Sequence, residues 1–262
     1  MKKILFLLLT ISILQSCKKT KRSFSIVKYV EFSLNEKGEP IGYGDTVAIE
    51  YYSKGVLKKK IMYDSVSGKR RTKKEVEYSS NGKEATYSFE IEHTLANKTE
   101  IERDSNGNIA MMKMYELNST DTSILLYKNM YKKGNFILQS EVWDNTSNSL
   151  KMVLDYEYDS NDRIISMRTL TVTDAARVLQ SVEKYAYDSK GNKVQEIVEN
   201  PVEGSVRKRV YKYGSENNIL NEALFDGAQL VYEITYSYEG GMKKEAVYTS
   251  GLKKKKIIFK YE

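Results

Sequence analysis

The sequence predicts an all-β protein, an antiparallel meander of hairpin repeats that is curled into a spiral, barrel-like or open curved sheet. Two aromatic residues separated by one residue recur five times in the C-terminal half, and four of these pairs lead directly into a turn. Between the turns, apolar and polar residues alternate with the period of two that is typical of strands. The aromatic pairs are Tyr156/Tyr158, Tyr185/Tyr187, Tyr211/Tyr213, Tyr236/Tyr238 and Phe259/Tyr261.

The turns that follow the pairs have the composition of hairpin turns. Glycine in Asn81-Gly82, Asn106-Gly107 and Gly191-Asn192 stands where a left-handed backbone is needed, and Asp104 or Asp188 can accept hydrogen bonds from the local backbone. Each repeat therefore contributes a strand, a turn and a second strand. Weaker copies extend the pattern towards the N-terminus, at residues 30–32, 49–51, 76–83, 101–109 and 130–136.

The repeats add up to roughly eighteen to twenty strands. An open twisted sheet rarely exceeds about ten strands without curling or splitting, and its apolar face has to be buried. We therefore expect a curled sheet with rows of tyrosines inside. The chief candidate for a helix is 173–180, where Asp174 would cap one or two turns, although a widened loop explains this segment equally well.

The N-terminus predicts an exported, lipid-anchored chain. Residues 1–16 read as a signal peptide, with a basic start and an apolar run too short to span a membrane. Cys17 is the only cysteine, which excludes an intramolecular disulfide and suits a lipidated thiol. We expect residues 17–25 to form a flexible basic tether and residues 26–262 a single β-hairpin repeat domain, because no Pro-rich or Gly/Ser-rich linker interrupts them.

The formal net charge of +7 is a mild excess of basic residues. The lysine runs at 58–60, 69–74 and 253–256 are interpreted as solvated strand faces and edges, where lysine discourages aggregation. Contact with lipid head groups or acidic glycans is the alternative interpretation. Nucleic acid is not expected as a partner.

Few side chains point to catalysis. His93 is the only histidine, and neither a second soft zinc ligand nor a nucleophile motif accompanies it. The turn at Asp104 lacks the full pattern of a calcium loop, and no phosphate-binding glycine loop precedes a helix. The sequence thus predicts no catalytic residue, no metal and no cofactor. A pair of carboxylates suited to glycoside hydrolysis remains open, because acidic residues are numerous.

The aromatic rows are the feature with potential for binding. If exposed, they could stack on sugar rings or on a protein partner; if they face inward, they are cross-strand core pairs. Trp143 carries the same ambiguity. The candidate ligand-binding residues are Tyr185, Tyr187, Tyr211, Tyr213, Tyr236 and Tyr238.

Two resemblances narrow the expectation. The residues before Cys17, with Leu14 and Ser16, resemble a bacterial lipobox, and the chain is similar to Bacteroidetes lipoproteins. The pattern Tyr-x-Tyr-Asp-x-x-Gly-Asn followed by an apolar strand resembles the YD repeats of RHS-type proteins, and its copies span most of residues 30–262. This resemblance implies a sheet that spirals into a shell or barrel-like wall, with binding or encapsulating repeats.

These observations lead to one main functional expectation. The chain is expected to be a membrane-anchored lipoprotein of the cell envelope, on the outer membrane facing the periplasm, that acts as a non-catalytic binding or structural scaffold for a protein or glycan. An immunity lipoprotein that caps an incoming toxin is the first alternative. A carbohydrate-active enzyme is the second.

Overall fold

The computed structural model describes residues 25–35, 37–66, 69–79, 83–91, 94–116, 122–132, 135–173 and 176–262. Within these ranges the regular structure is all β, with no helix. The strands are β1 (Ile26–Leu34), β2 (Pro40–Ser53), β3 (Val56–Val66), β4 (Lys69–Tyr78), β5 (Glu84–Ile91), β6 (Thr94–Arg103), β7 (Ile109–Glu116), β8 (Thr122–Lys132), β9 (Phe136–Asp144), β10 (Ser149–Tyr158), β11 (Ile164–Val172), β12 (Arg177–Tyr187), β13 (Lys193–Asn200), β14 (Ser205–Tyr213), β15 (Ile219–Asp226), β16 (Gln229–Glu239), β17 (Met242–Ser250) and β18 (Lys253–Tyr261).

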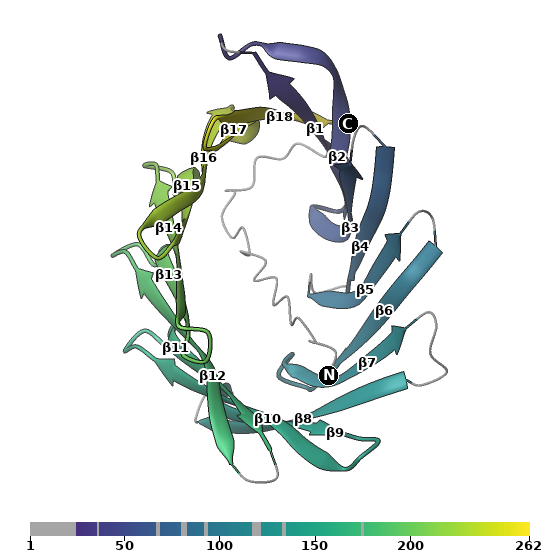
Figure 1. Ribbon diagram of the computed structural model, residues 1–262, viewed down its shortest axis with the longest axis vertical. Helices are drawn as coiled ribbons and strands as arrows, with labels where there is room; N and C mark the ends of the chain where they lie inside the picture. Colours follow the sequence, from purple (N-terminus) through teal and green to yellow (C-terminus); the bar gives the residue numbers. More distant parts are fainter. Residues whose placement is uncertain are drawn as a thin grey trace.

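The strands form one closed antiparallel barrel (Figure 1). Each strand pairs with its neighbours in the chain, and β18 returns to pair with β1 from Val27 opposite Tyr261 to Ser33 opposite Lys255. The expectation of a barrel-like sheet is confirmed, whereas the spiral and the open curved sheet are not supported. Closure removes both edge strands, and so the unpaired backbone groups that an open sheet would expose.

The helix considered at 173–180 is wrong. Arg177 begins β12 and pairs with Val172 of β11, and the register continues through Val178 opposite Thr171. The backbone amide of Thr173 donates to the carbonyl oxygen of Ala176 at 2.9 Å, which closes a tight connection. Pairing on both sides of β12 outweighs the weak local preference for a helix; Asp174 lies outside the described residues.

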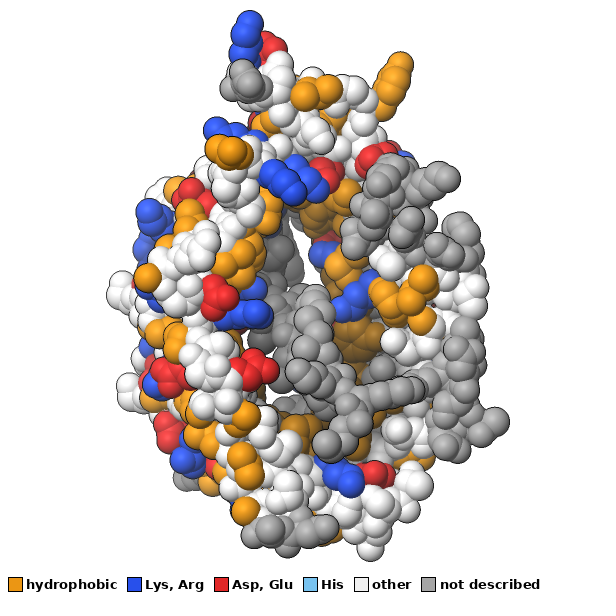
Figure 2. Space-filling model, viewed as in Figure 1, with side chains coloured by type: hydrophobic (Ala, Val, Ile, Leu, Met, Phe, Trp, Pro, Cys, Tyr) orange, Lys and Arg blue, Asp and Glu red, His pale blue; other side chains and the backbone are white. Residues whose placement is uncertain are grey.

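The two faces of the barrel differ in burial. In a closed curved sheet the inward side chains converge and the outward ones spread apart, so the more buried set marks the inner wall. Thirteen described side chains at the inward positions of their strands are at most 8% exposed: Val27, Ala48, Glu50, Val76, Leu125, Ser140, Val142, Thr169, Glu183, Glu196, Tyr211, Ala246 and Phe259. Figure 2 shows the molecule hollowed between its walls, with hydrophobic side chains along the opening.

The seam where the chain closes on itself contains a buried hydrophobic cluster. Val27 of β1, Ala246 of β17 and Phe259 of β18 form a buried cluster, and the Tyr29 and Phe259 rings meet edge to face with centroids 4.8 Å apart. Aromatic pairs of this geometry add about 0.5–1.5 kcal/mol beyond the burial of their area. Non-local aromatic packing therefore supports the pairing of β1 with β18.

The turns after β6, β10 and β12 are held by aspartate, as the sequence predicts. One carboxylate oxygen of Asp104 accepts hydrogen bonds from the amides of Asn106 and Asn108, each at 2.9 Å. Asp159 and Asp188 repeat this arrangement in later turns. The glycine of the turn adopts the left-handed backbone at Gly107 (φ 78°) and at Gly191 (φ 85°). These bonds explain why aspartate and glycine recur at fixed spacing in the repeats.

The second aromatic of each pair fastens its repeat to the preceding strand. The hydroxyls of these tyrosines donate to backbone carbonyl oxygens near the start of the neighbouring strand, at 2.8–2.9 Å. The donor and acceptor pairs are Tyr158 with Ile137, Tyr187 with Ile164, Tyr213 with Lys193, Tyr238 with Ile219 and Tyr261 with Lys243. We call these five contacts the tyrosine latches; they link successive turns along one rim of the barrel.

Candidate functional site: a charged network on the inner wall

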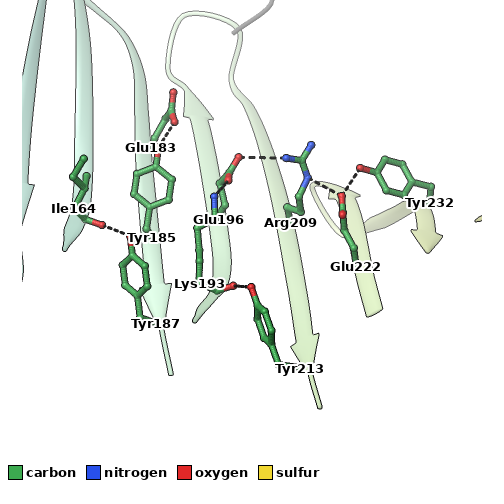
Figure 3. Close-up of polar contacts among 10 residues, drawn as sticks. All are labelled: Ile164, Glu183, Tyr185, Tyr187, Lys193, Glu196, Arg209, Tyr213, Glu222 and Tyr232. Atoms are coloured by element: carbon green, nitrogen blue, oxygen red, sulfur yellow. Dashed lines mark hydrogen bonds and ion pairs between the residues drawn. The ribbon is translucent and has the colours of Figure 1, made fainter. Parts of the chain in front are cut away.

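A row of charged and phenolic side chains crosses the inner wall from β12 to β16 (Figure 3). The strand register brings them together: Tyr185 of β12 lies opposite Glu196 of β13, and Glu196 lies opposite Arg209 of β14. Side chains two residues apart on one strand share a face, so Glu183 joins Tyr185 on the inner wall. Glu222 of β15 and Tyr232 of β16 complete the row, which we call the inner-wall network.

Two cations hold two of the carboxylates in this network. The Nζ of Lys193 lies 2.6 Å from Oε2 of Glu196, and Nη1 of Arg209 lies 3.7 Å from Oε1 of the same glutamate. On its other side, Nε of Arg209 lies 3.4 Å from Oε1 of Glu222. The hydroxyl of Tyr232 also donates to Glu222, at 3.0 Å. Arg209 therefore bridges two glutamates.

Glu183 has a different environment. It is only 3% exposed, and its carboxylate accepts a hydrogen bond from the hydroxyl of Tyr185. No lysine or arginine of the described part of the chain forms an ion pair with it. Burial, with a further contribution from the charge of Glu196, raises the pKa of Glu183 above its usual value. Burial and the nearby Glu183 charge likewise raise the pKa of Tyr185, so this phenol stays a hydrogen-bond donor.

The inner-wall network therefore has an unbalanced charge. It contains three carboxylates, Glu183, Glu196 and Glu222, but only two cations, Lys193 and Arg209. The unmatched carboxylate is Glu183. A buried charge without a partner is costly, so Glu183 either takes up a proton or needs a cation from outside the network.

Glu50 of β2 is a second buried glutamate, and both of its carboxylate oxygens have partners. Oε1 of Glu50 lies 2.8 Å from Nζ of Lys60, and Oε2 accepts from the hydroxyl of Tyr52 at 2.7 Å. Burial by itself would raise the pKa of Glu50, but Lys60 and the hydroxyls of Tyr29 and Tyr52 hold that pKa below its usual value. Glu50 is therefore a charged, satisfied part of the wall.

The six tyrosines proposed from sequence all lie on the inner wall, and several already have structural contacts. Tyr187, Tyr213 and Tyr238 form tyrosine latches. Tyr211 is 3% exposed, and Tyr185 donates to Glu183. The Nζ of Lys243 lies 4.5 Å from the centre of the Tyr236 ring. Of the six, Tyr185 belongs to the inner-wall network.

Sequence reasoning missed the charged members of the network. Glu183, Glu196, Arg209 and Glu222 stand at inward positions of strands whose other inward residues are mostly apolar or aromatic. The signal that would have found them is a charged residue at the same alternation phase as the paired tyrosines. Buried charges at such positions need partners, and their clustering on neighbouring strands marks a site.

Trp143, whose role the sequence left open, belongs to the outer wall. It shares the face of Lys128, whose Nζ lies 3.9 Å from the centre of the indole ring. The indole nitrogen donates to Oε2 of Glu141 at 3.1 Å. Both the face of the indole ring and its N–H group therefore have partners on the outer wall, Lys128 and Glu141.

Several sequence predictions fall on residues outside the described ranges. They are the signal peptide at residues 1–16, Cys17 with nearly all of the tether, and His93. The described residues contain no group of three or more His, Cys, Asp and Glu side chains arranged to hold a metal ion. A search of the same residues for a helix long and apolar enough to cross a membrane finds none.

Comparison with known proteins places the chain near no named family. No family model matches the sequence, and no curated protein matches it. A crystal structure of a porin-like protein from Bacteroides uniformis is similar over 91% of this chain and 96% of that chain, with 9% identity and a TM-score of 0.44. A crystal structure of TcdB2-TccC3-Cdc42 is similar over 85% of this chain, with 11% identity and a TM-score of 0.38. This chain spans only 14% of the TcdB2-TccC3-Cdc42 chain.

Proposed function

We propose that this protein is a membrane-anchored envelope lipoprotein whose barrel is a non-catalytic scaffold that binds a protein or glycan ligand at its inner wall. The inner-wall network is the observation that supports this proposal. A buried polar cluster in which one carboxylate lacks a cation lowers the stability of the fold. Such a cluster is explained if a ligand supplies the missing partner. Preformed polar groups on rigid strands are typical of binding sites.

The charged side chains of the outer wall support the proposal that the outside of the barrel is in contact with water. Ion pairs stand on outward positions of the strands, such as Lys184 with Glu199 at 2.7 Å and Arg168 with Asp155 at 3.1 Å. A barrel embedded in lipid instead presents an apolar band about 25 Å tall on its outside. The charged outer wall therefore favours anchoring through a lipidated terminus over insertion of the barrel itself.

The start of the barrel supports the same arrangement. Ser25 donates its amide to the carbonyl oxygen of Glu262 at 2.8 Å and accepts from the amide of Tyr52 at the same distance. The first described residue is thus fixed at the seam, on the rim that carries the aspartate turns. A tether from Cys17 would join the barrel at this rim.

The charge arrangement favours binding over two-carboxylate hydrolysis. Glycoside hydrolysis uses one protonated and one free carboxylate. The buried Glu183 suits the first role, but Glu196 is neutralised by Lys193 and Arg209, and Glu222 is held by Arg209 and Tyr232. The network thus supplies one unmatched carboxylate, which suits recognition of a ligand.

Two experiments test this proposal. Fractionation of cells should find the protein with membranes, and Cys17→Ala should release it; unchanged membrane association of that variant would refute the anchor. The whole chain, immobilised, should capture purified cell-wall glycan fragments or a defined envelope protein, and substitution of Tyr185 by Phe together with Glu183 by Gln should weaken capture. Lys184→Gln, on the outer face of the same strand, is the matched control and should leave capture unchanged.

A further inference from the structure

We propose that the inner wall between β11 and β12 binds a primary ammonium group of the ligand, with the carboxylate of Glu183 and the hydroxyl of Thr169 as its hydrogen-bond acceptors. This inference rests on the proposed binding function and deepens it by naming the chemical class of the ligand. The ligand is then an amine, for example a glycan with a free amino group.

The first observation is a second incompletely bonded group beside Glu183. Thr169 is only 7% exposed, and its Oγ1 has no hydrogen-bond partner in the described structure. Since most buried side-chain polar atoms are hydrogen-bonded, an isolated hydroxyl of this kind calls for an explanation. A ligand atom that reaches Oγ1 would supply the missing bond.

The register places the two groups on one patch of the inner wall. Met167 of β11 lies opposite Glu183 of β12, and Thr169 lies opposite Ser181. Thr169 and Glu183 are therefore diagonal neighbours on the same face, a relation that separates two residues by about 7–8 Å and their β-carbons by somewhat less. One nitrogen that bonds both oxygens, each at about 2.9 Å, requires the two side chains to extend towards each other across this spacing.

The negative charge of Glu183 favours a cationic ligand group at this part of the inner wall. Glu196 and Glu222 have Lys193 and Arg209, and Glu50 has Lys60, whereas no ion pair of the described residues includes Glu183, which accepts a hydrogen bond from the hydroxyl of Tyr185. One added positive charge would make the cations of the inner-wall network equal to its carboxylates. In a buried site such a pair interacts more strongly than in water.

The hydrogen-bond chemistry selects an ammonium group among cations. A carboxylate only accepts hydrogen bonds, and an ammonium group offers three donors. The rings of Tyr185 and of Tyr156, whose strand lies next to β11, add aromatic faces that favour an organic cation. A divalent metal would need several more oxygen ligands, and the described residues hold no such group.

Binding also has a defined proton balance. When Glu183 carries a proton in the free protein, arrival of the ammonium group releases that proton to solvent, and the amine keeps all of its own. Affinity therefore rises as the pH increases through the pKa of Glu183, until the amine itself deprotonates. The titratable groups that surround Glu183 are Tyr185 on β12, Glu196 and Lys193 on β13, and Tyr156 on β10, while β11 contributes only the non-ionisable Met167 and Thr169.

The test uses the whole purified chain and a minimal probe. In calorimetric titrations at pH 8, propylamine should bind and propanol, of the same shape but neutral, should bind at least about tenfold more weakly. Glu183→Gln should weaken propylamine binding at least about tenfold, and the isosteric Thr169→Val about threefold or more. Glu199→Gln removes a carboxylate from the outer wall and should change nothing. Thermal unfolding of each variant checks that the barrel is intact.

Each outcome decides between the two proposals. Equal binding of propylamine and propanol, unchanged binding by Glu183→Gln, or no heat from propylamine up to high millimolar concentration would each overturn the ammonium site. A parallel titration with chitin oligomers and with their deacetylated forms separates the two ideas. Tight binding of both forms, insensitive to Glu183→Gln, refutes the ammonium site and leaves the scaffold function standing. Propylamine binding without any glycan or protein ligand supports the site and refutes the wider function.

Discussion

Glu50 and Glu183 lie on the same inner wall, are almost equally buried and yet have opposite pKa shifts. Glu50 is 6% exposed and pairs with Lys60, Tyr29 and Tyr52; Glu183 is 3% exposed and has the hydroxyl of Tyr185. Burial raises the pKa in both cases, but only at Glu50 do a cation and several donors outweigh it. The partner set therefore decides whether the pKa of a buried carboxylate in this wall is lowered or raised.

The two pKa shifts differ because different residues lie opposite Glu50 and Glu183 on the neighbouring strands. Lys60 of β3 lies directly opposite Glu50 of β2. The residue opposite Glu183 on β11 is Met167, and on β13 it is Val198, neither of which can neutralise a charge. Two apolar neighbours at those positions leave the Glu183 carboxylate without a cross-strand cation. Substitution of a single side chain at either glutamate tests this difference.

The largest effect is expected from removing the bridging cation of the inner-wall network. Arg209→Met removes one of the cations at Glu196 and the cation at Glu222, so the surroundings of both carboxylates become more like those of Glu183. Loss of one member of a buried ion network costs about 3–5 kcal/mol. Urea unfolding at pH 7 measures the loss. Lys208→Met, one residue earlier on the outer face, should stay within about 0.5 kcal/mol, and an equal loss in both variants would contradict the role of Arg209.

Glu50→Gln tests the satisfied site and should destabilise the protein by about 3 kcal/mol at pH 7, because Lys60 loses its carboxylate. The sign of the pH dependence follows from the lowered pKa. The stabilisation by Glu50 is present above the unfolded-state pKa and is lost as the pH falls through the lower folded-state pKa. The wild type and the variant should therefore converge in strongly acidic buffer. Adding Lys60→Met should recover part of the loss, and a double variant no more stable than Glu50→Gln would argue against a specific pair.

Glu183→Gln should change the free energy of unfolding in the opposite direction to Glu50→Gln. Since the folded-state pKa of Glu183 is raised, its favourable contribution is present below the unfolded-state pKa and disappears as the pH rises through the folded-state pKa. The neutral amide should therefore stabilise the free protein by roughly 1 kcal/mol at pH 8 and have little effect near pH 4. Unfolding measured across this pH range gives the answer, and destabilisation at pH 8 would show that Glu183 has a partner comparable to Lys60.

The sequence predicts the repeating parts of this structure well. Asp104, Asp188 and the turn glycines act within a few residues of themselves, so their spacing is enough to place the hairpin turns. The eighteen strands in the described part of the chain lie within the expected range. Closure depends on β1 meeting β18, which are more than two hundred residues apart, and no local pattern encodes that contact.

The inner-wall network was harder to predict, for a related reason. The alternation phase shows that Glu183, Glu196 and Arg209 share a face, but their contacts depend on how neighbouring strands slide. Irregularities such as the shift between Ala186 and Tyr187 change the register near the end of a strand. A shift of one residue moves a side chain to the other face. Residue spacing alone therefore does not show that Glu183 lies beside Met167 instead of a lysine.

The smallest effect concerns the tyrosine latches, which hold the strands on which this register depends. Tyr213→Phe removes one hydroxyl that donates to the carbonyl oxygen of Lys193 at 2.9 Å and leaves the ring in place. One such hydrogen bond contributes about 1 kcal/mol. Tyr248→Phe is the control, because the Tyr248 ring packs 5.4 Å from that of Tyr232 on the same inner face, with no hydrogen bond from its hydroxyl in the described structure. Urea midpoints should fall more for Tyr213→Phe. The lost hydrogen bond ends at the backbone of Lys193, whose side chain also neutralises Glu196. Hydrogen exchange of backbone amides should therefore become faster in β13 before it does in other strands. Equal urea midpoints for the two variants would show that the latch does not contribute to stability.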